Sequence, residues 1–302
     1  MKTLWRLALV AAVVAFLAAL MGSWTRINGA GLTCPDWPLC HGKLIPSFAD
    51  GTIWEWSHRF LVFLVSPLVL AVIIVGWRFR TVTPIRLSLC AIGALFVVQV
   101  LLGAATVYLS NNPISVVLHW GTAMAFVAVL VTLAIFARSE GTEFADSSQT
   151  PRKQSSLIGL LAGTMLVTFV TMCVGAYVSS SGAGLACLSL PGCVGNIVVY
   201  SDGQYVQMLH RFMAAASLLC AAAAFALGLV WRASARVRVA LSFGVLFIFV
   251  QIVLGLLNVA FRLPIDLREA HAANAVFVFL SFVVATVFAL LDTVRFRRMV
   301  AG

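Results

Sequence analysis

Residues 29–34 read GAGLTC, and residues 182–187, which lie 153 positions further along the chain, read GAGLAC. A second pair of segments, QVLLGA at 99–104 and QIVLGL at 251–256, is related by a shift of 152 positions. Matches at an almost constant shift indicate an internal repeat, which has to be recognised before a fold is assigned. The 302-residue chain is therefore predicted to consist of two related halves.

Between these repeated segments the chain is too apolar for a water-soluble protein. Hydrophobic residues make up 62% of the sequence and charged residues 10%, whereas about 25% of the residues in a soluble domain are charged. A soluble enzyme is excluded, because a globule of this size cannot bury so much apolar surface in one core, and a disordered chain is excluded as well. The lipid bilayer is therefore the predicted solvent.

Eight runs of the sequence are long and apolar enough to cross a bilayer, which takes about 20 residues. Backbone groups inside the bilayer must bond to one another, so each run is predicted to be a helix. The fold is therefore predicted to be an all-α integral membrane protein, in which two tandem four-helix bundles are related by a pseudo-twofold axis along the membrane normal. The predicted spans are 4–22, 57–77, 87–109, 114–137, 156–178, 205–231, 237–259 and 270–293.

The basic residues predict the orientation and the domain bounds. Of the 20 Lys and Arg residues, 14 lie at the two ends of the chain or in the junctions that follow even-numbered spans. Cytoplasmic loops carry an excess of Lys and Arg, so both termini are predicted to be cytoplasmic. The net charge of +10 then reflects topology rather than nucleic acid binding. The predicted domains are the first half at 1–137, a polar cytoplasmic linker at 138–155 and the second half at 156–302.

Four of the five histidines form two repeat-related pairs: His58 and His119 recur, 152 positions later, as His210 and His271. Each lies near the start of an even-numbered span, so the two imidazoles of one half are expected at the same depth. Two facing imidazoles suit haem iron, which takes axial ligands from opposite sides. A zinc ion would need three or four ligands, which neither half offers. Interfacial histidines that bind only headgroups are the alternative, and the duplication of the pattern disfavours it.

Two cysteine pairs also recur, as Cys34 with Cys40 and Cys187 with Cys193. Both pairs lie in loops predicted on the non-cytoplasmic side, which is oxidising, so each pair is predicted to form a local disulfide. A disulfide that closes so short a loop adds little to global stability. Two roles therefore stay open, a structural clip of the loop and a redox-active bond that exchanges with a thiol.

The two halves differ beside their first histidine. Glu55 precedes His58 by three residues, whereas Gln207 stands in the same place before His210. Residues at i and i+3 share a helix face, so only the first half has a carboxyl group beside its histidine site. Such a group can transfer protons or stabilise a developing cation. The first half is therefore predicted to perform chemistry, and the second to bind a permanent cofactor or carry electrons; a solvated interfacial glutamate is the alternative.

Further polar residues recur around these sites. Arg59 and Arg211 follow the two histidines directly and are candidate anchors for porphyrin propionates, because arginine binds carboxylates through two hydrogen bonds. Both could equally be interfacial residues whose charged ends reach water. Gln99 and Gln251 lie in the middle of spans, each with a glycine four residues later, and this pattern favours close helix packing over ligand binding.

On these residues the chain resembles the heme A synthase family over nearly its whole length. The resemblance implies an oxidoreductase that acts on a CH or CH2 group, namely the C8 methyl of heme O. Successive hydroxylations would convert this methyl to a formyl group and give heme A for cytochrome c oxidase. The segments that carry the resemblance are NGAGLTCPDWPLCHG at 28–42, EWSHRF at 55–60, GAGLACLSLPGC at 182–193, LHRF at 209–212 and EAHAANA at 269–275.

The resemblance also implies a role for each residue singled out above. Four histidines are axial ligands, Glu55 is the catalytic carboxylate, and the two cysteine pairs are disulfides. The implied assignments are His58 and His119 to the iron of the substrate heme O, His210 and His271 to the iron of a resident heme b, and the disulfides Cys34–Cys40 and Cys187–Cys193.

The resemblance further implies a setting. The chain is expected in a bacterial plasma membrane, with its haem sites near the extracytoplasmic face. Heme O synthase (protoheme farnesyltransferase) would supply the substrate, the product would enter cytochrome c oxidase assembly, and an unidentified membrane partner would exchange electrons. No nucleic acid partner is expected, and a homo-oligomer stays open.

Two other functions would also fit a haem site in each half. One is a di-haem cytochrome b-like electron carrier, such as a quinol oxidoreductase, and the other is a haem transporter or chaperone. The difference between Glu55 and Gln207 favours the enzyme, because a symmetrical electron carrier needs no such difference. An electron carrier would also place haems near both membrane faces, whereas all four histidines are predicted near one.

Overall fold

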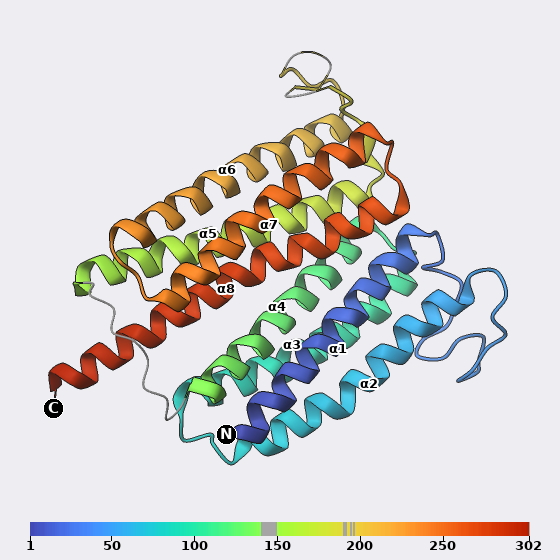
Figure 1. Cartoon of the computed structure of the whole chain (residues 1–302). Helices are drawn as coiled ribbons and strands as arrows, with labels where there is room; N and C mark the ends of the chain where they lie inside the picture. The colour runs from blue at the N-terminus through green and yellow to red at the C-terminus, as the bar shows by residue number, and fades with distance from the viewer. Residues whose placement is uncertain (140–149, 190–191, 194, 196, 302) are drawn as a thin grey trace. The chain divides into compact units, whose positions relative to one another are not determined.

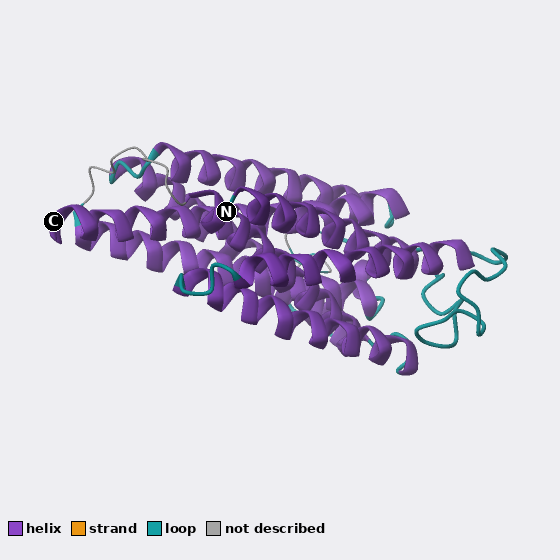
Figure 2. Cartoon of the chain, turned by 90° about the horizontal axis from the view of Figure 1, so that it is seen from below, coloured by secondary structure: helices purple, strands orange, loops and turns teal. Residues whose placement is uncertain are grey.

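The structure is a computed structural model that describes residues 1–139, 150–189, 192–193, 195 and 197–301. The regular structure of these residues is helical, joined by loops (Figure 2). Most of the predicted linker at 138–155 lies outside the described residues, so the prediction for it stays a prediction.

Eight helices of the described chain are long and apolar enough to cross a membrane. The predicted all-α, eight-span architecture is therefore confirmed. Each predicted span falls on one helix, and most helices begin several residues earlier, because a helix can continue beyond the hydrocarbon layer into the polar interface. The helices are α1 (Lys2–Ile27), α2 (Thr52–Trp77), α3 (Thr83–Tyr108), α4 (Pro113–Ser139), α5 (Pro151–Ser180), α6 (Asp202–Val230), α7 (Ala235–Ala260) and α8 (Ile265–Ala301), with a short 3-10 helix, η1, at Ala183–Leu185.

The chain forms two compact units, which are described separately below. The first unit comprises Met1–Glu140, Ser179–Ser181 and Pro264–Ala272, so it contains α1 to α4. The second unit comprises Gly141–Val178, Gly182–Leu263 and Ala273–Gly302.

In the first unit each of the four helices contacts two others, in the order α1, α2, α3, α4 and back to α1. Figure 1 shows α1, in dark blue, between α2 and α4. The buried side chains of α1 recur in steps of four and three residues, which is the spacing of a helix that faces its neighbours along one stripe. Most of them are alanines, and such small side chains allow close approach between membrane helices. The residues that follow this spacing are Leu4, Ala8, Ala11, Ala15 and Ala18, and Ala12, Ser23 and Thr25 are buried as well.

The second unit has one apolar core to which all four of its helices contribute. Phe282 of α8 is fully buried and packs with Leu161 of α5, Ala221 of α6 and Leu241 of α7. Gly244 of α7 makes room for the phenylalanine, because a Cβ at this position would lie 2.9 Å from the Phe282 ring. Burial of this apolar surface joins the helices into a bundle.

Candidate functional site

Helix α1 fixes the imidazole of His58, which lies in the second turn of α2. The Nδ1 atom of His58 lies 2.8 Å from the carbonyl oxygen of Ala18. A carbonyl oxygen only accepts hydrogen bonds, so Nδ1 carries the proton and Nε2 keeps its lone pair. One turn further along α1, a Cβ on Gly22 would lie 2.8 Å from Cε1 of His58, so the ring occupies the space that glycine leaves. A histidine that binds a metal is usually oriented by such a bond from its other nitrogen.

The second histidine of this unit, His119, lies on α4 and packs against α3. A Cβ on Gly103 would lie 3.3 Å from Cε1 of His119, and Nε2 of Gln99 lies 3.4 Å from Nε2 of His119. The Nδ1 atom of His119 is buried and has no hydrogen-bond partner among the residues that the structure describes. His58 and His119 therefore lie on two helices of the first unit, α2 and α4, both of which contact α1. Their pairing around one haem stays a prediction.

The second unit repeats the contact between a glycine and an imidazole. His210 lies on α6, and a Cβ on Gly175 of α5 would lie 2.8 Å from its Cε1 atom. Gly175 is the repeat counterpart of Gly22, 153 positions later in the sequence. The fourth predicted ligand, His271, lies on α8 in residues assigned to the first unit. Its pairing with His210 stays a prediction.

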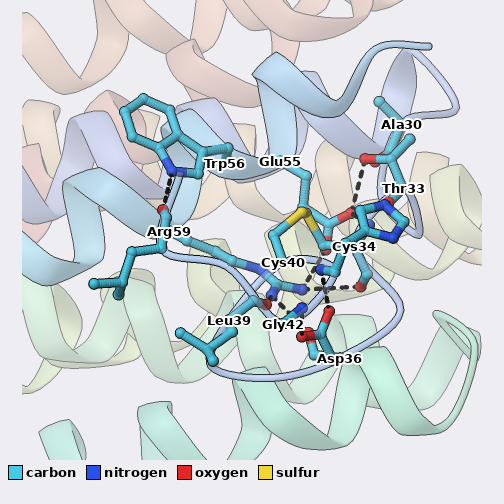
Figure 3. The surroundings of a disulfide bond; sticks show 12 residues. Ala30, Thr33, Cys34, Asp36, Leu39, Cys40, Gly42, Glu55, Trp56 and Arg59 are labelled. Atoms are coloured by element: carbon cyan, nitrogen blue, oxygen red, sulfur yellow. Dashed lines mark hydrogen bonds and ion pairs between the residues drawn. A yellow bond between two sulfur atoms is a disulfide. The ribbon is translucent and has the colours of Figure 1, made fainter. Parts of the chain in front are cut away.

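The carboxylate of Glu55 binds the loop that joins α1 to α2, at 28–51, here named the first cysteine loop. Glu55 is only 4% exposed. Its Oε2 atom accepts hydrogen bonds from the amide of Cys34 at 2.9 Å and from the hydroxyl of Thr33 at 3.1 Å. Its Oε1 atom accepts a bond of 2.7 Å from the guanidinium of Arg59. These contacts, the Glu55 network, are drawn in Figure 3.

Arg59 holds the same loop through its backbone carbonyls. Its guanidinium donates to the carbonyl oxygens of Cys34 at 3.1 Å and Asp36 at 2.6 Å, and also to that of Leu39. Cys34 and Cys40 form the predicted disulfide within this loop (Figure 3). The loop is thus closed twice, covalently by the disulfide and through hydrogen bonds by Arg59.

A carboxylate in the same loop stabilises its turn. Asp36 accepts hydrogen bonds from the amides of Gly42 at 2.7 Å and His41 at 2.6 Å. These bonds, with Gly42 contributing most, lower the pKa of Asp36 below its ordinary value. A carboxyl whose pKa is depressed in the folded state stabilises that state above its unfolded-state pKa, and the contribution is lost as the pH falls through the depressed value. The turn is therefore expected to persist at neutral pH and to loosen only in acid.

The second half repeats these contacts with a neutral side chain. The Oε1 atom of Gln207 accepts a hydrogen bond of 2.6 Å from the amide of Cys187, the counterpart of Cys34, and its Nε2 donates to Gly184 at 2.9 Å. Cys187 and Cys193 form the second predicted disulfide. Arg211 donates to loop carbonyls at 2.7 to 2.8 Å, namely those of Ser189, Gly192 and Cys187. An amide and a carboxylate therefore fill the same structural place in the two halves.

The sequence missed three features of this region. Arg59 and Arg211 bind loop carbonyls, a task not predicted for them, while their contact with propionates stays a prediction. Gly22 and Gly175, which face the imidazoles of His58 and His210, were not predicted to contact them, although both glycines follow the repeat. Gln99 was assigned to helix packing, yet its amide lies beside His119.

Replacing Arg59 by glutamine is expected to expose the first disulfide to reductants. The change removes the ion pair with Glu55 and the bonds to the loop carbonyls, and a hydrogen bond to a charged group contributes about 1.5 kcal/mol or more. Since 1.4 kcal/mol corresponds to a factor of about ten in an equilibrium, we expect Cys34–Cys40 to be reduced about tenfold faster. The rate is measured by alkylating the released thiols and analysing the peptides by mass spectrometry. Cys187–Cys193 in the same molecule is the control, and equal acceleration of both disulfides would contradict the role of Arg59.

The donor set of the first unit fits a haem. One imidazole presents an oriented Nε2, a second imidazole lies on another helix of the same unit, and a glycine leaves room for each ring. Among the described residues no group of three or more His, Cys, Asp or Glu side chains could hold a bare metal ion. A metal that brings its own four equatorial ligands, as haem does, needs only the two axial nitrogens.

Comparison with known proteins agrees with this chemistry. Residues 5–283 match the model of the COX15-CtaA family, described as cytochrome oxidase assembly proteins. The heme A synthase of Bacillus licheniformis is 31% identical over 315 residues, with 99% of both chains covered. The heme A synthase of Bacillus pumilus is 32% identical over 224 residues, and that of Staphylococcus aureus strain Newman is 33% identical over 221 residues, each covering 70% of this chain. With a family model that spans most of its length and a relative that matches it from end to end, the chain belongs to the heme A synthase family.

Proposed function

We propose that this chain oxidises the C8 methyl group of heme O to a formyl group and so produces heme A for cytochrome c oxidase. The observation that carries the proposal is the buried carboxylate of Glu55, one helical turn from His58 and replaced by an amide in the second half. The names of the relatives support the same reaction. The enzyme class is an oxidoreductase that acts on a CH or CH2 group.

The chemistry requires two rounds of oxidation with water as a reactant. In the first, the methyl group and one water give the alcohol, two electrons and two protons. In the second, the alcohol and another water give a geminal diol, two electrons and two protons, and the diol loses water to leave the aldehyde. The electrons would pass to a membrane-bound electron acceptor. Glu55, which precedes His58 by three residues on the same helix face, would accept a proton when water adds.

The histidines would position the haems. His58 and His119 would hold heme O through its iron, while His210 and His271 would hold a resident heme b that supplies one-electron chemistry when bound. The orientation of the His58 ring, which leaves its Nε2 free of a proton, supports the assignment of His58 to heme O. The contact of His210 with a glycine, which repeats that of His58, supports the assignment of His210 to heme b.

The proposed setting is a bacterial plasma membrane with both termini in the cytoplasm. The excess of Lys and Arg in the even-numbered junctions and at the termini supports this orientation. The cysteine loops and the haem sites would then face the extracytoplasmic side, where disulfides persist. Heme O synthase would deliver the substrate, because the product of that enzyme is the molecule consumed here.

Co-expression with a heme O synthase in a bacterium that lacks heme A tests the proposal. Haems extracted from the membranes and separated by chromatography are expected to contain heme A and its hydroxylated precursor. A strain with heme O synthase alone is the control and should contain heme O only. Intact protein that yields neither oxidised haem would contradict the enzyme assignment and leave a carrier or a transporter.

A further inference from the structure

The two histidines of the first unit are held in different ways. His58 is fixed through Nδ1, which donates to the Ala18 carbonyl at 2.8 Å, and Gly22 lies against the same ring. Helix backbone supplies both contacts, so the ring cannot rotate without losing a hydrogen bond. Such a bond from the other nitrogen also raises the basicity of a metal-bound imidazole. His58 is therefore built as a permanent ligand.

His119 lacks the equivalent bond. Its Nδ1 atom is buried without a hydrogen-bond partner in the described part of the chain. Its Nε2 atom, which would bind iron, lies 3.4 Å from the side-chain amide of Gln99. The Oε1 atom of this amide is also buried, and no described residue bonds to it. The Nε2 atom of His119, which would bind iron, thus already has the Gln99 amide beside it as an alternative partner.

The second half differs at the matching position. The counterpart of Gln99 is Gln251, and its Oε1 accepts a hydrogen bond of 2.7 Å from Nδ2 of Asn274. Asn274, on α8, also donates to the carbonyl of Phe247 on α7 at 2.8 Å. The side-chain amide of Gln251 is therefore held in place by a bond to the neighbouring helix. In the first half the residue at the position of Asn274 is Thr122, and within the described residues no hydrogen bond is made to the Oε1 of Gln99. The half that carries Glu55 is therefore also the half in which the glutamine amide, that of Gln99, can bond to a histidine.

We propose that His119 is the exchangeable axial ligand of the substrate haem and that Gln99 binds its Nε2 when this nitrogen leaves the iron. The proposal rests on the proposed function, because it assumes that heme O lies between His58 and His119. In the exchange the iron–nitrogen bond breaks and a hydrogen bond from the Gln99 amide to Nε2 forms, with no change in electron count. His58 keeps the haem in place throughout. Release of His119 would leave His58 as the one protein ligand of the substrate haem, which would allow the haem to be exchanged between turnovers, whereas a permanent haem needs no such release.

Carbon monoxide binding to added heme O tests the exchange, because carbon monoxide binds ferrous haem only where an axial position opens. The purified full-length protein is titrated with heme O, reduced with dithionite and exposed to carbon monoxide, and difference spectra isolate the added haem from any resident one. The unmodified chain should bind carbon monoxide at the added haem. Gln99→Leu should bind it about fivefold more weakly, since the hydrogen bond that stabilises the dissociated imidazole contributes about 1 kcal/mol.

Three variants complete the design. Gln251→Leu, the matched change in the second half, should leave carbon monoxide binding to the added haem unchanged. His119→Ala should bind carbon monoxide more tightly than the unmodified chain while keeping heme O, whereas His58→Ala should lose heme O. Gln99→Ala repeats the test in case leucine disturbs packing, and an unaltered spectrum of the resident haem confirms that a variant is folded.

The proposal is overturned if the added haem does not bind carbon monoxide, or if both Gln99 variants bind it as strongly as the unmodified chain. It is also overturned if His119→Ala loses heme O while His58→Ala keeps it, since the labile ligand would then be His58. These outcomes can occur while heme A is still produced in cells, so they separate failure of the exchange from failure of the proposed function. Absence of any heme O binding would overturn both.

Discussion

Replacing Glu55 by glutamine is expected to abolish heme A production while the protein keeps its fold. A positioned acid or base contributes about 100-fold or more to the rate of a proton-transfer step, and glutamine cannot exchange a proton. The loop should persist, because Gln207 shows that an amide accepts the hydrogen bond from the cysteine amide of its loop. Arg59 should also keep its hydrogen bonds to the loop carbonyls, since Arg211 makes the same kind of bonds beside a neutral side chain.

The loss is measured as the ratio of heme A to heme O in membranes of cells that also express heme O synthase. The spectrum of the resident haem and the intact Cys34–Cys40 disulfide report on folding. Gln207→Glu is the matched variant and is expected to leave heme A production within about twofold, because the second half is assigned no proton transfer. Full activity of Glu55→Gln would remove this carboxyl from the chemistry.

Two glycine substitutions are expected to empty the haem sites one at a time. In Gly22→Ala the new Cβ would lie 2.8 Å from the ring of His58, and in Gly175→Ala it would lie 2.8 Å from that of His210. The His58 ring cannot move aside without losing its bond to Ala18. Alanine stabilises a helix interior by about 1 kcal/mol relative to glycine, so a loss of binding cannot arise from weaker helices. Gly22→Ala should lose heme O binding and heme A production, and Gly175→Ala should lose the resident haem, as His210→Ala would.

Haem content is measured from the absorption spectrum of purified protein before and after titration with heme O. The chain offers matched controls on membrane helices. Outside the local backbone of its own helix, no atom of the described residues lies within 4 Å of a Cβ placed on Gly163 of α5, and the nearest such atom to one on Gly93 of α3 is 3.9 Å away. Both control substitutions should therefore bind haem normally. A Gly175→Ala variant that keeps the full spectrum of the resident haem would contradict the steric argument.

The fold could be predicted from the sequence because each helix is indicated by its own apolar run and the repeat supports the assignment a second time. Each span needs only enough apolar residues to cross the bilayer, and the repeat supplies a second copy of every segment. Both disulfides were predicted from spacing and compartment, and both are present. The contrast between Glu55 and Gln207 could also be seen in the sequence, since it needs only a comparison of two matched positions.

The remaining features of the site depend on contacts between helices, which no local pattern encodes. The sequence places Ala18 and Gly22 on one face of a helix but does not say that this face meets His58. Arginine suits carboxylates and backbone carbonyls alike, so only the path of the loop decides which of them Arg59 binds. The contrast between Gln99, whose amide lies beside His119, and Gln251, whose amide is bonded to Asn274, becomes visible only when both sets of contacts are known.

The shared architecture of the two cysteine loops has an evolutionary consequence. A carboxylate in one half and an amide in the other accept the same bond from a cysteine amide, and the loop closes around either. If the internal repeat arose by duplication of a four-helix unit, an exchange between glutamate and glutamine in one copy would have left its loop folded. Reactivity could therefore be gained by one copy or silenced in the other through a single codon change, and the two descendants could specialise without passing through a misfolded ancestor.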